Sequence, residues 1–83
     1  MPLEKLKKAK KVAIGTKQVL KAAENKETVL IFVAQDADAK VVEPLSTYCN
    51  EHGVQIVSID SRIQLGKACG IDVGAAAAAI LKD

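Results

Sequence analysis

The chain has little of what several classes of protein require. It contains two cysteines, one phenylalanine, one tyrosine and no tryptophan in 83 residues. Two cysteines cannot form a disulfide framework, which favours a reducing, cytoplasmic location. The longest apolar run, residues 73–81, has about half the length that a membrane-spanning helix needs. No long apolar segment follows the lysines near the start, so we expect neither a signal peptide nor contact with a membrane.

Metal ligands and catalytic groups are also scarce. Cys49, His52 and Cys69 lack a fourth ligand and a second close pair, so we expect no metal site. Asp36 and Asp38 share one stretch without a nucleophile or a cofactor motif beside them, and capping of backbone groups explains them better. We therefore predict no catalytic residue, no metal and no cofactor. His52 is expected to contact the last carbonyls of a helix, and Cys49 to act as a small core residue.

What the chain does have is a strong charge asymmetry. Residues 1–21 carry seven lysines and one glutamate, a balance of +6, whereas the remainder has a balance of −4. Such a basic segment is typical of a protein that binds a polyanion, above all a nucleic acid. The alternative is a solvated, lysine-rich helix face that only aids solubility.

The apolar pattern predicts one domain, residues 1–83, with strands and helices in alternation. Leu3, Leu6 and Ala9 space like one side of a first helix, and residues 12–14 form a short strand candidate. Residues 28–34, TVLIFVA, are almost continuously apolar, which is typical of a central strand covered on both faces. Residues 54–59 are the next strand candidate. This order predicts an α/β fold: a three-layer α/β/α sandwich with a mixed sheet of about four strands.

Two helices follow from local signals in the second half. The first has Pro44 in its first turn, Leu45, Tyr48 and Cys49 facing inward, and Gly53 as its end. A second helix opens with a capping box of Ser61 and Gln64 and ends at Gly70. Its inward residues are expected to be Ile63, Leu65 and Ala68.

Five consecutive alanines, residues 75–79, present conflicting signals. Intrinsic propensity makes them helical, but a helix of such small side chains buries little apolar surface. A final strand whose small residues let helices approach closely explains them better, and we predict a strand.

The segment GTKQVLK, residues 15–21, lies at a strand-to-helix junction. The unpaired backbone N–H groups of a first helical turn attract anions, and Lys17 and Lys21 lie one turn apart on the same helix face. Gln18 carries both a donor and an acceptor, which suits a base edge. The first glycine of a nucleotide-hydrolase phosphate loop is absent. The alternative here is an ordinary glycine-capped helix with exposed lysines.

A second segment, residues 65–80, is too apolar and too glycine-rich for an ordinary loop. It holds three of the five glycines, with Ile71 and Val73 isolated between them. Phe32 and Tyr48 are both predicted to face the core, which leaves no aromatic platform for stacking single-stranded bases. A basic helix start and an aliphatic loop point instead to structured RNA recognised by its shape.

Together these two segments resemble the kink-turn-binding ribosomal protein superfamily. Its archaeal and eukaryotic members share a motif of glycine, a small residue, asparagine, glutamate, two variable residues and lysine. The short bacterial form similarly places IGTKQ before the second helix and LGKACGI in the loop, as here in residues 14–18 and 65–71. The resemblance covers essentially the whole chain and implies an α/β/α sandwich that grips a sharply bent RNA duplex containing G·A pairs.

The resemblance also implies roles for residues. The helix start would contact the G·A region and its phosphates, Ile71 and Val73 would pack on extruded nucleotides, and Gly70 and Gly74 would let the backbone approach. Lys17 and Gln18 stand where many members have asparagine and glutamate, and Gln18 lacks the charge of that acceptor. The predicted RNA-binding residues are Gly15, Thr16, Lys17, Gln18, Lys21, Lys67, Gly70, Ile71, Asp72 and Val73.

We therefore expect a monomeric, cytoplasmic binding protein for kink-turns in ribosomal, riboswitch or other structured RNA, with the ribosome as a further partner. The alternative is a ribosome-associated or protein-interaction module that uses Ile71 and Val73 as an apolar contact, because a fold alone does not define a role.

Overall fold

Four helices and four strands make up the computed structural model, which describes residues 2–82. In chain order they are α1 (Pro2–Lys8), β1 (Val12–Ile14), α2 (Thr16–Glu24), β2 (Thr28–Ala34), α3 (Ala39–His52), β3 (Ile56–Ile59), α4 (Arg62–Ala68) and β4 (Ala77–Leu81).

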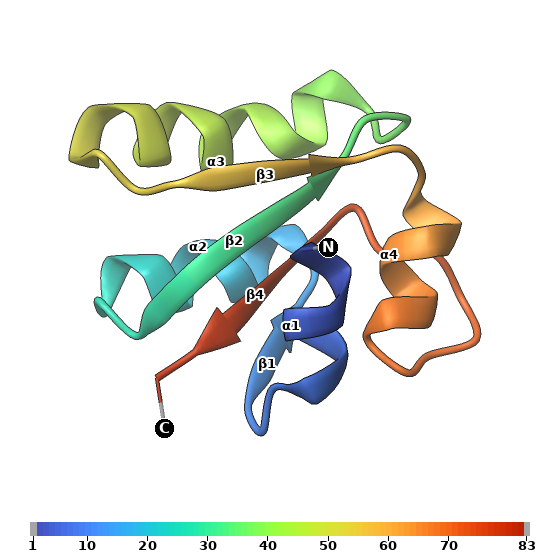
Figure 1. Cartoon of the computed structure of the whole chain (residues 1–83). Helices are drawn as coiled ribbons and strands as arrows, with labels where there is room; N and C mark the ends of the chain where they lie inside the picture. Colours follow the sequence, from blue (N-terminus) through green and yellow to red (C-terminus); the bar gives the residue numbers. More distant parts are fainter. Residues whose placement is uncertain (1, 83) are drawn as a thin grey trace.

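The strands form one mixed sheet in the order β1-β4-β2-β3. β4 pairs antiparallel with both β1 and β2, and β3 pairs parallel with β2. Two helices cover each face: α1 and α4 pack on one side, and α2 and α3 on the other (Figure 1). The predicted three-layer α/β/α fold with a mixed four-stranded sheet is confirmed.

The central strand β2 contributes to both cores because its side chains alternate between the two faces. Phe32 points to the α1–α4 side, and Ile31 and Val33 point to the α2–α3 side. Phe32 and Ile31 are fully buried. Burial on both faces explains the nearly continuous apolar run in the sequence.

Three of the five alanines, Ala77 to Ala79, belong to the second central strand, as predicted, whereas Ala75 and Ala76 precede it. Ala77, Ala78 and Ala79 have no exposed surface, and β4 is hydrogen-bonded on both edges. Ala78 faces the α1–α4 core, and its two neighbours face the other core. Strand pairing on two sides outweighs the helix propensity of alanine, and the small side chains let helices approach both faces.

One expectation about the start of α3 and one about the start of β3 are wrong. Pro44 lies inside the helix rather than in its first turn, because α3 already begins at Ala39 with Asp38 as its N-cap. The Asp38 side chain accepts a hydrogen bond from the backbone N–H of Lys40 at 2.9 Å. Val54 does not start a strand, since its N–H completes the helix end by donating to the Cys49 carbonyl at 2.9 Å. The predicted end of α3 at Gly53, in the left-handed conformation, is confirmed.

In α4 the predicted N-terminus is confirmed but one inward residue is wrong. The Ser61 hydroxyl accepts from the Gln64 backbone N–H at 3.1 Å, and Leu65 and Ala68 are buried. Ile63 is 63% exposed. Residues two apart lie on different sides of a helix, so Ile63 and Leu65 cannot both face the core.

None of the helices in residues 2–82 combines the length and the apolar character that crossing a membrane requires.

Candidate nucleic-acid interface

Several loops meet at one edge of the sheet, where β1, β2 and β3 end and β4 begins. The Gly15 N–H donates to the Ala77 carbonyl at 2.9 Å, which fixes the start of α2 beside the start of β4. The Ala34 N–H donates to Ala76 at 2.9 Å, and the Gln35 N–H donates to Ile59 at 2.7 Å. Residues 15–21, the first segment selected from the sequence, therefore flank the same edge as residues 70–74, the glycine-bounded loop within the second segment (residues 65–80).

The start of α2 leaves backbone donors free to meet a ligand. Gly15 is the N-cap, with φ of 98°, and no side chain caps the helix. The first intrahelical bond is donated by Val19 to Gly15, so the N–H groups of residues 16–18 precede it at the helix end. Lys17, Gln18 and Lys21 are exposed, and the first turn carries no acidic residue. This end of the helix attracts anions.

The loop after α4 folds back onto that helix. Gly70 adopts the left-handed conformation, with φ of 80°, and the Ile71 N–H donates to the Gly66 carbonyl at 3.1 Å. Further on, the Ala75 N–H donates to the Arg62 carbonyl at 3.0 Å. The backbone of Val73 lies directly against Gly66, where no side chain fits. Contacts at both ends of α4 therefore hold residues 70–75 in place.

The apolar side chains of this loop divide into a buried and an exposed part. Val73 is 69% exposed, whereas Ile71 is half-buried and packs against the core beneath α1 and α4. Ile63 on α4 is the second strongly exposed aliphatic residue here. A small cavity of about 220 Å³ is lined by Ile63, Lys67, Ile71, Asp72, Val73 and Gly74. The exposed apolar pair is thus Val73 with Ile63, not Val73 with Ile71.

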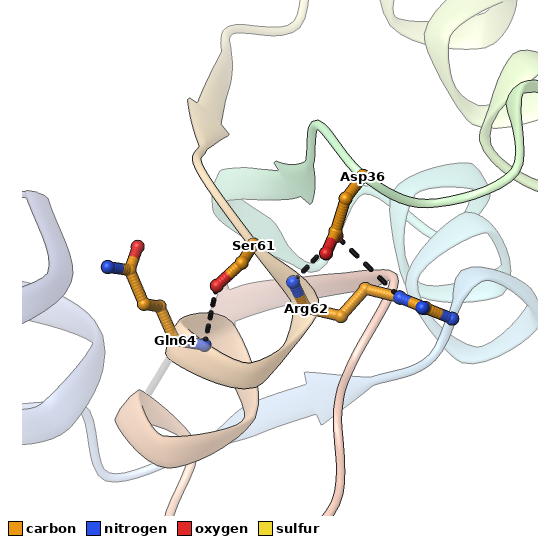
Figure 2. A network of polar contacts seen from close by, with 4 residues as sticks. All are labelled: Asp36, Ser61, Arg62 and Gln64. Atoms are coloured by element: carbon orange, nitrogen blue, oxygen red, sulfur yellow. Dashed lines mark hydrogen bonds and ion pairs between the residues drawn. The ribbon is translucent and has the colours of Figure 1, made fainter.

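Arg62 is another candidate site residue, one that the sequence motifs do not single out. Its backbone N–H donates to Asp36 Oδ1 at 2.8 Å, and its Nε lies 3.6 Å from the same oxygen (Figure 2). Both side chains are about half exposed, so the ion pair contributes little stability by itself. Its effect is positional, because it joins the loop after β2 to the start of α4. Arg62 is the chain's only arginine, which was the available signal in the sequence.

The basic first quarter of the chain does not form one surface. Lys5, Lys7 and Lys8 lie on α1, on one side of the sheet, whereas Lys17 and Lys21 lie on α2, on the other. The sequence places these lysines close together, and the strand β1 between the two helices separates them.

The cysteines and the histidine behave as core and capping residues. Cys49 belongs to the core under α2 and α3, whereas Cys69 packs on the opposite core. Burial raises the pKa of both thiols, so the neutral forms are favoured. His52 contacts the Tyr48 carbonyl through Nδ1 at 3.0 Å, as expected for a residue at the helix end, and its ring stacks on the Tyr48 ring. Among residues 2–82, no group of three possible ligands could hold a metal ion.

The fold is a mixed four-stranded sheet between two pairs of helices. The candidate site joins an open helix start to an apolar loop bounded by glycines. Together these features define a class of small α/β/α proteins. Comparison with known families identifies which class this is. The chain belongs to the Ribosomal protein L7Ae/L30e/S12e/Gadd45 family, whose model matches residues 2–83. The family expected from the two segments is confirmed.

Individual relatives match along the whole chain. The chain is 45% identical over 82 residues to RNA-binding protein YbxF of Geobacillus stearothermophilus, covering 99% of this chain and 100% of that protein. It is 44% identical over 82 residues to an RNA-binding protein of Halalkalibacterium halodurans, with the same coverage. The predicted likeness to the short bacterial form is confirmed.

Solved structures agree with the fold. The Giardia lamblia 15.5kD RNA binding protein superposes with a TM-score of 0.88 at 31% identity, covering 99% of this chain and 72% of that one. A protein of unknown function from Bacillus halodurans superposes with a TM-score of 0.83 at 22% identity, which supports the fold alone.

Proposed function

We propose that this chain is an RNA-binding protein that recognises the kink-turn, through the edge of the sheet where α2 starts and α4 returns to β4. The observation that carries the proposal is the pairing of two unlike surfaces at this edge. One is an uncapped helix start with exposed Lys17 and Lys21, and the other is the exposed aliphatic pair Ile63 and Val73. The whole-chain similarity to relatives named as RNA-binding proteins supports the same function.

Each surface suits a different part of a bent duplex. The N–H groups of residues 16–18 and the two lysines suit phosphate oxygens, which approach closely where the backbone turns sharply. The amide of Gln18 can both donate to and accept from a purine edge. Bases that have left the stack expose apolar faces, and Val73 with Ile63 can cover them without an aromatic ring. A kinked RNA presents all three features together, whereas a regular duplex presents only phosphates.

Binding then stabilises the bent state by population shift. A protein that binds only the kinked form moves the equilibrium by its difference in affinity for the two forms. The site needs no chemical step, no metal and no cofactor for this action.

The direct test is a titration of two RNA duplexes that differ only at the kink. One carries the kink-turn, and in the other its G·A pairs are replaced by Watson–Crick pairs. We expect clearly tighter binding to the first. Equal affinity for both RNAs would refute kink-turn recognition. The same titration would still measure how tightly the protein binds RNA in general.

Two variants separate base reading from phosphate binding. We expect Gln18→Ala to reduce the preference for the G·A-containing RNA, and Lys21→Ala to weaken binding to both RNAs, each by about 1–3 kcal/mol at most. Lys26→Ala is the matched control, since Lys26 is an exposed lysine beyond the other end of α2. If Lys21→Ala and Lys26→Ala behave alike, the start of α2 is not the binding edge.

The exposed Ile63 and Val73 also favour a second candidate, an apolar docking site for a protein, including one bound to the ribosome. Salt dependence separates the two candidates. Phosphate contacts make affinity fall steeply between low and moderate salt, whereas an apolar protein interface gives a nearly flat response.

A further inference from the structure

Most of the positive charge of the chain lies outside the edge described above. α1 and the turn after it carry five exposed lysines against the single Glu4, whereas the start of α2 offers only Lys17 and Lys21. Helix α1 lies across the sheet from α2 (Figure 1), so its lysines do not add to the positive field at the start of α2. The proposed kink-turn contact therefore leaves the larger basic group unused.

The α1 lysines share a surface with α4. A shallow cavity of about 390 Å³ lies between α1, β3 and α4, with Lys7 on one wall and Lys67 on the other. Leu3, Ile59 and Ala68 form its apolar base. Asp60 also lines this cavity, but the single ion pair among residues 2–82 joins Arg62 to Asp36. The ammonium groups of α1 are therefore held by no carboxylate in the described part of the chain.

This surface is continuous with the loop after α4. Lys67 lines the cavity beside α1 and also the smaller cavity formed with Ile71 and Val73. A ligand that contacts Val73 and continues across α4 passes Lys67 and then reaches Lys7 on α1. The length of α4, seven residues, corresponds to about 10 Å.

We propose that Lys7, Lys8 and Lys67, the α1–α4 surface, form a second RNA contact. It binds the phosphates of the helical stem next to the kink, without reading the sequence of that stem. This inference extends the proposed function and rests on it for the identity of the RNA. Lysine side chains act as mobile point charges, which suits a regular row of phosphates better than a single oriented group.

The composition of the surface favours a phosphate backbone over an acidic protein. The cores of protein interfaces are depleted of charge and rely on exposed apolar or aromatic anchors. In the described part of the chain, the exposed large apolar residues are Val29, Val41, Ile63 and Val73, and none of them lies on α1 or lines the cavity between α1 and α4. Ile63 and Val73 line the smaller neighbouring cavity instead. Charge without an apolar anchor is typical of backbone binding to nucleic acid.

The test compares kink-turn RNAs whose two stems differ in length. One RNA has two short stems, and two others lengthen one stem each. We expect wild-type protein to gain affinity when one particular stem is lengthened, and Lys7→Gln/Lys8→Gln to lose that gain while still binding the short-stem RNA. Lys26→Gln/Lys82→Gln removes the same charge near the turn between α2 and β2 and serves as the control, because the Lys82 N–H donates to the Glu27 carbonyl there.

Salt dependence supplies a quantitative readout. Each phosphate contact contributes about 0.9 to the slope of log affinity against log salt on a duplex. Loss of two contacts lowers the slope by about 1.8, so between 50 and 200 mM salt the wild type loses about 12-fold more affinity than the double variant. Lys7→Arg/Lys8→Arg keeps the charge and is expected to keep the wild-type slope.

Three results would overturn the inference: no gain from either longer stem, a slope of the double variant equal to that of the control variant, or wild-type binding of every RNA by Lys7→Gln/Lys8→Gln. The last result would leave an acidic protein as the partner of this surface. Failure of the proposed function is a separate outcome. In that case the wild type binds the kink-turn and the Watson–Crick duplex equally, and the stem and salt measurements can still be made on either RNA.

Discussion

Replacement of Gly66 by alanine tests how tightly the loop after α4 packs on its helix. Gly66 is buried in the middle of α4, and an added Cβ would overlap the carbonyl oxygen of Val73. The same Cβ would lie 3.1 Å from the Val73 carbonyl carbon and 3.3 Å from the Gly74 Cα. All three atoms belong to the backbone, so no side-chain rotation relieves the overlap.

The magnitude follows from two opposing effects. Alanine in place of glycine in a helix interior stabilises by about 1 kcal/mol. An extra methyl group forced into a packed site costs about 1–3 kcal/mol, and a backbone neighbour places this case at the upper end. The net expected loss is about 2 kcal/mol, which corresponds to a fall in melting temperature of roughly 8–16 °C for a domain of this size.

Thermal or urea unfolding followed by circular dichroism measures the stability, and amide chemical shifts of residues 71–75 report the displaced loop. Because Val73 moves with the loop, affinity for kink-turn RNA is expected to fall in Gly66→Ala. Gly53→Ala is the matched control: its φ of 67° is unfavourable for alanine, but nothing lies within 4 Å of the new Cβ. It is expected to lose about 1 kcal/mol with unchanged RNA affinity.

An increase in stability of Gly66→Ala by about 1 kcal/mol, with unchanged shifts in residues 71–75, would refute the reasoning. It would mean that α4 and the loop are not in contact at Gly66, and that the close approach does not hold Val73 in place.

Three further predictions concern single residues. Val73→Asp is expected to weaken binding of kink-turn RNA about tenfold and to change unfolding free energy by less than about 0.5 kcal/mol, since the side chain is 69% exposed; a large drop in melting temperature would instead place Val73 in the core. Asp36→Ala removes the acceptor for the Arg62 N–H at the start of α4 and is expected to cost about 1 kcal/mol in urea unfolding, and an unchanged midpoint would show that this contact is not formed in solution. Burial raises the pKa of the Cys49 thiol above its ordinary value of 9.0, so we expect slow labelling of Cys49 by a thiol reagent in folded protein at pH 8. The part of the folding free energy that depends on a neutral Cys49 thiol is fully present below pH 9.0 and is lost as the pH rises through the pKa of that thiol in the folded protein. Fast labelling of Cys49 without denaturant would contradict its burial.

Local signals predicted most of the elements correctly because their causes lie within a few residues. Ser61 accepts from the N–H of Gln64 three residues on, and the end of α3 needs only the left-handed conformation of Gly53. The errors also have local causes. Asp38, a good N-cap, precedes Pro44 by six residues, so the helix starts well before the proline. Ile63 lies two residues before the buried Leu65, a spacing at which two helical residues cannot both face inward.

The candidate site was predictable only in part. The start of α2 and the loop around Val73 were found because glycines and isolated aliphatic residues mark them in the sequence. Arg62, Ile63 and Gly66 were missed, since each acquires its role from a partner elsewhere in the chain: Asp36, Val73 or the loop backbone.

The sequence by itself determined the order of helices and strands, the buried character of β2 and β4, and the two segments that form the candidate interface, because periodicity, capping and residue size act locally. Only the tertiary structure decided which helices share a face of the sheet. The strand order β1-β4-β2-β3 depends on pairing between residues far apart in the chain. That order places Lys7 with Lys67 and away from Lys17, and so divides one basic stretch of sequence into two separate surfaces.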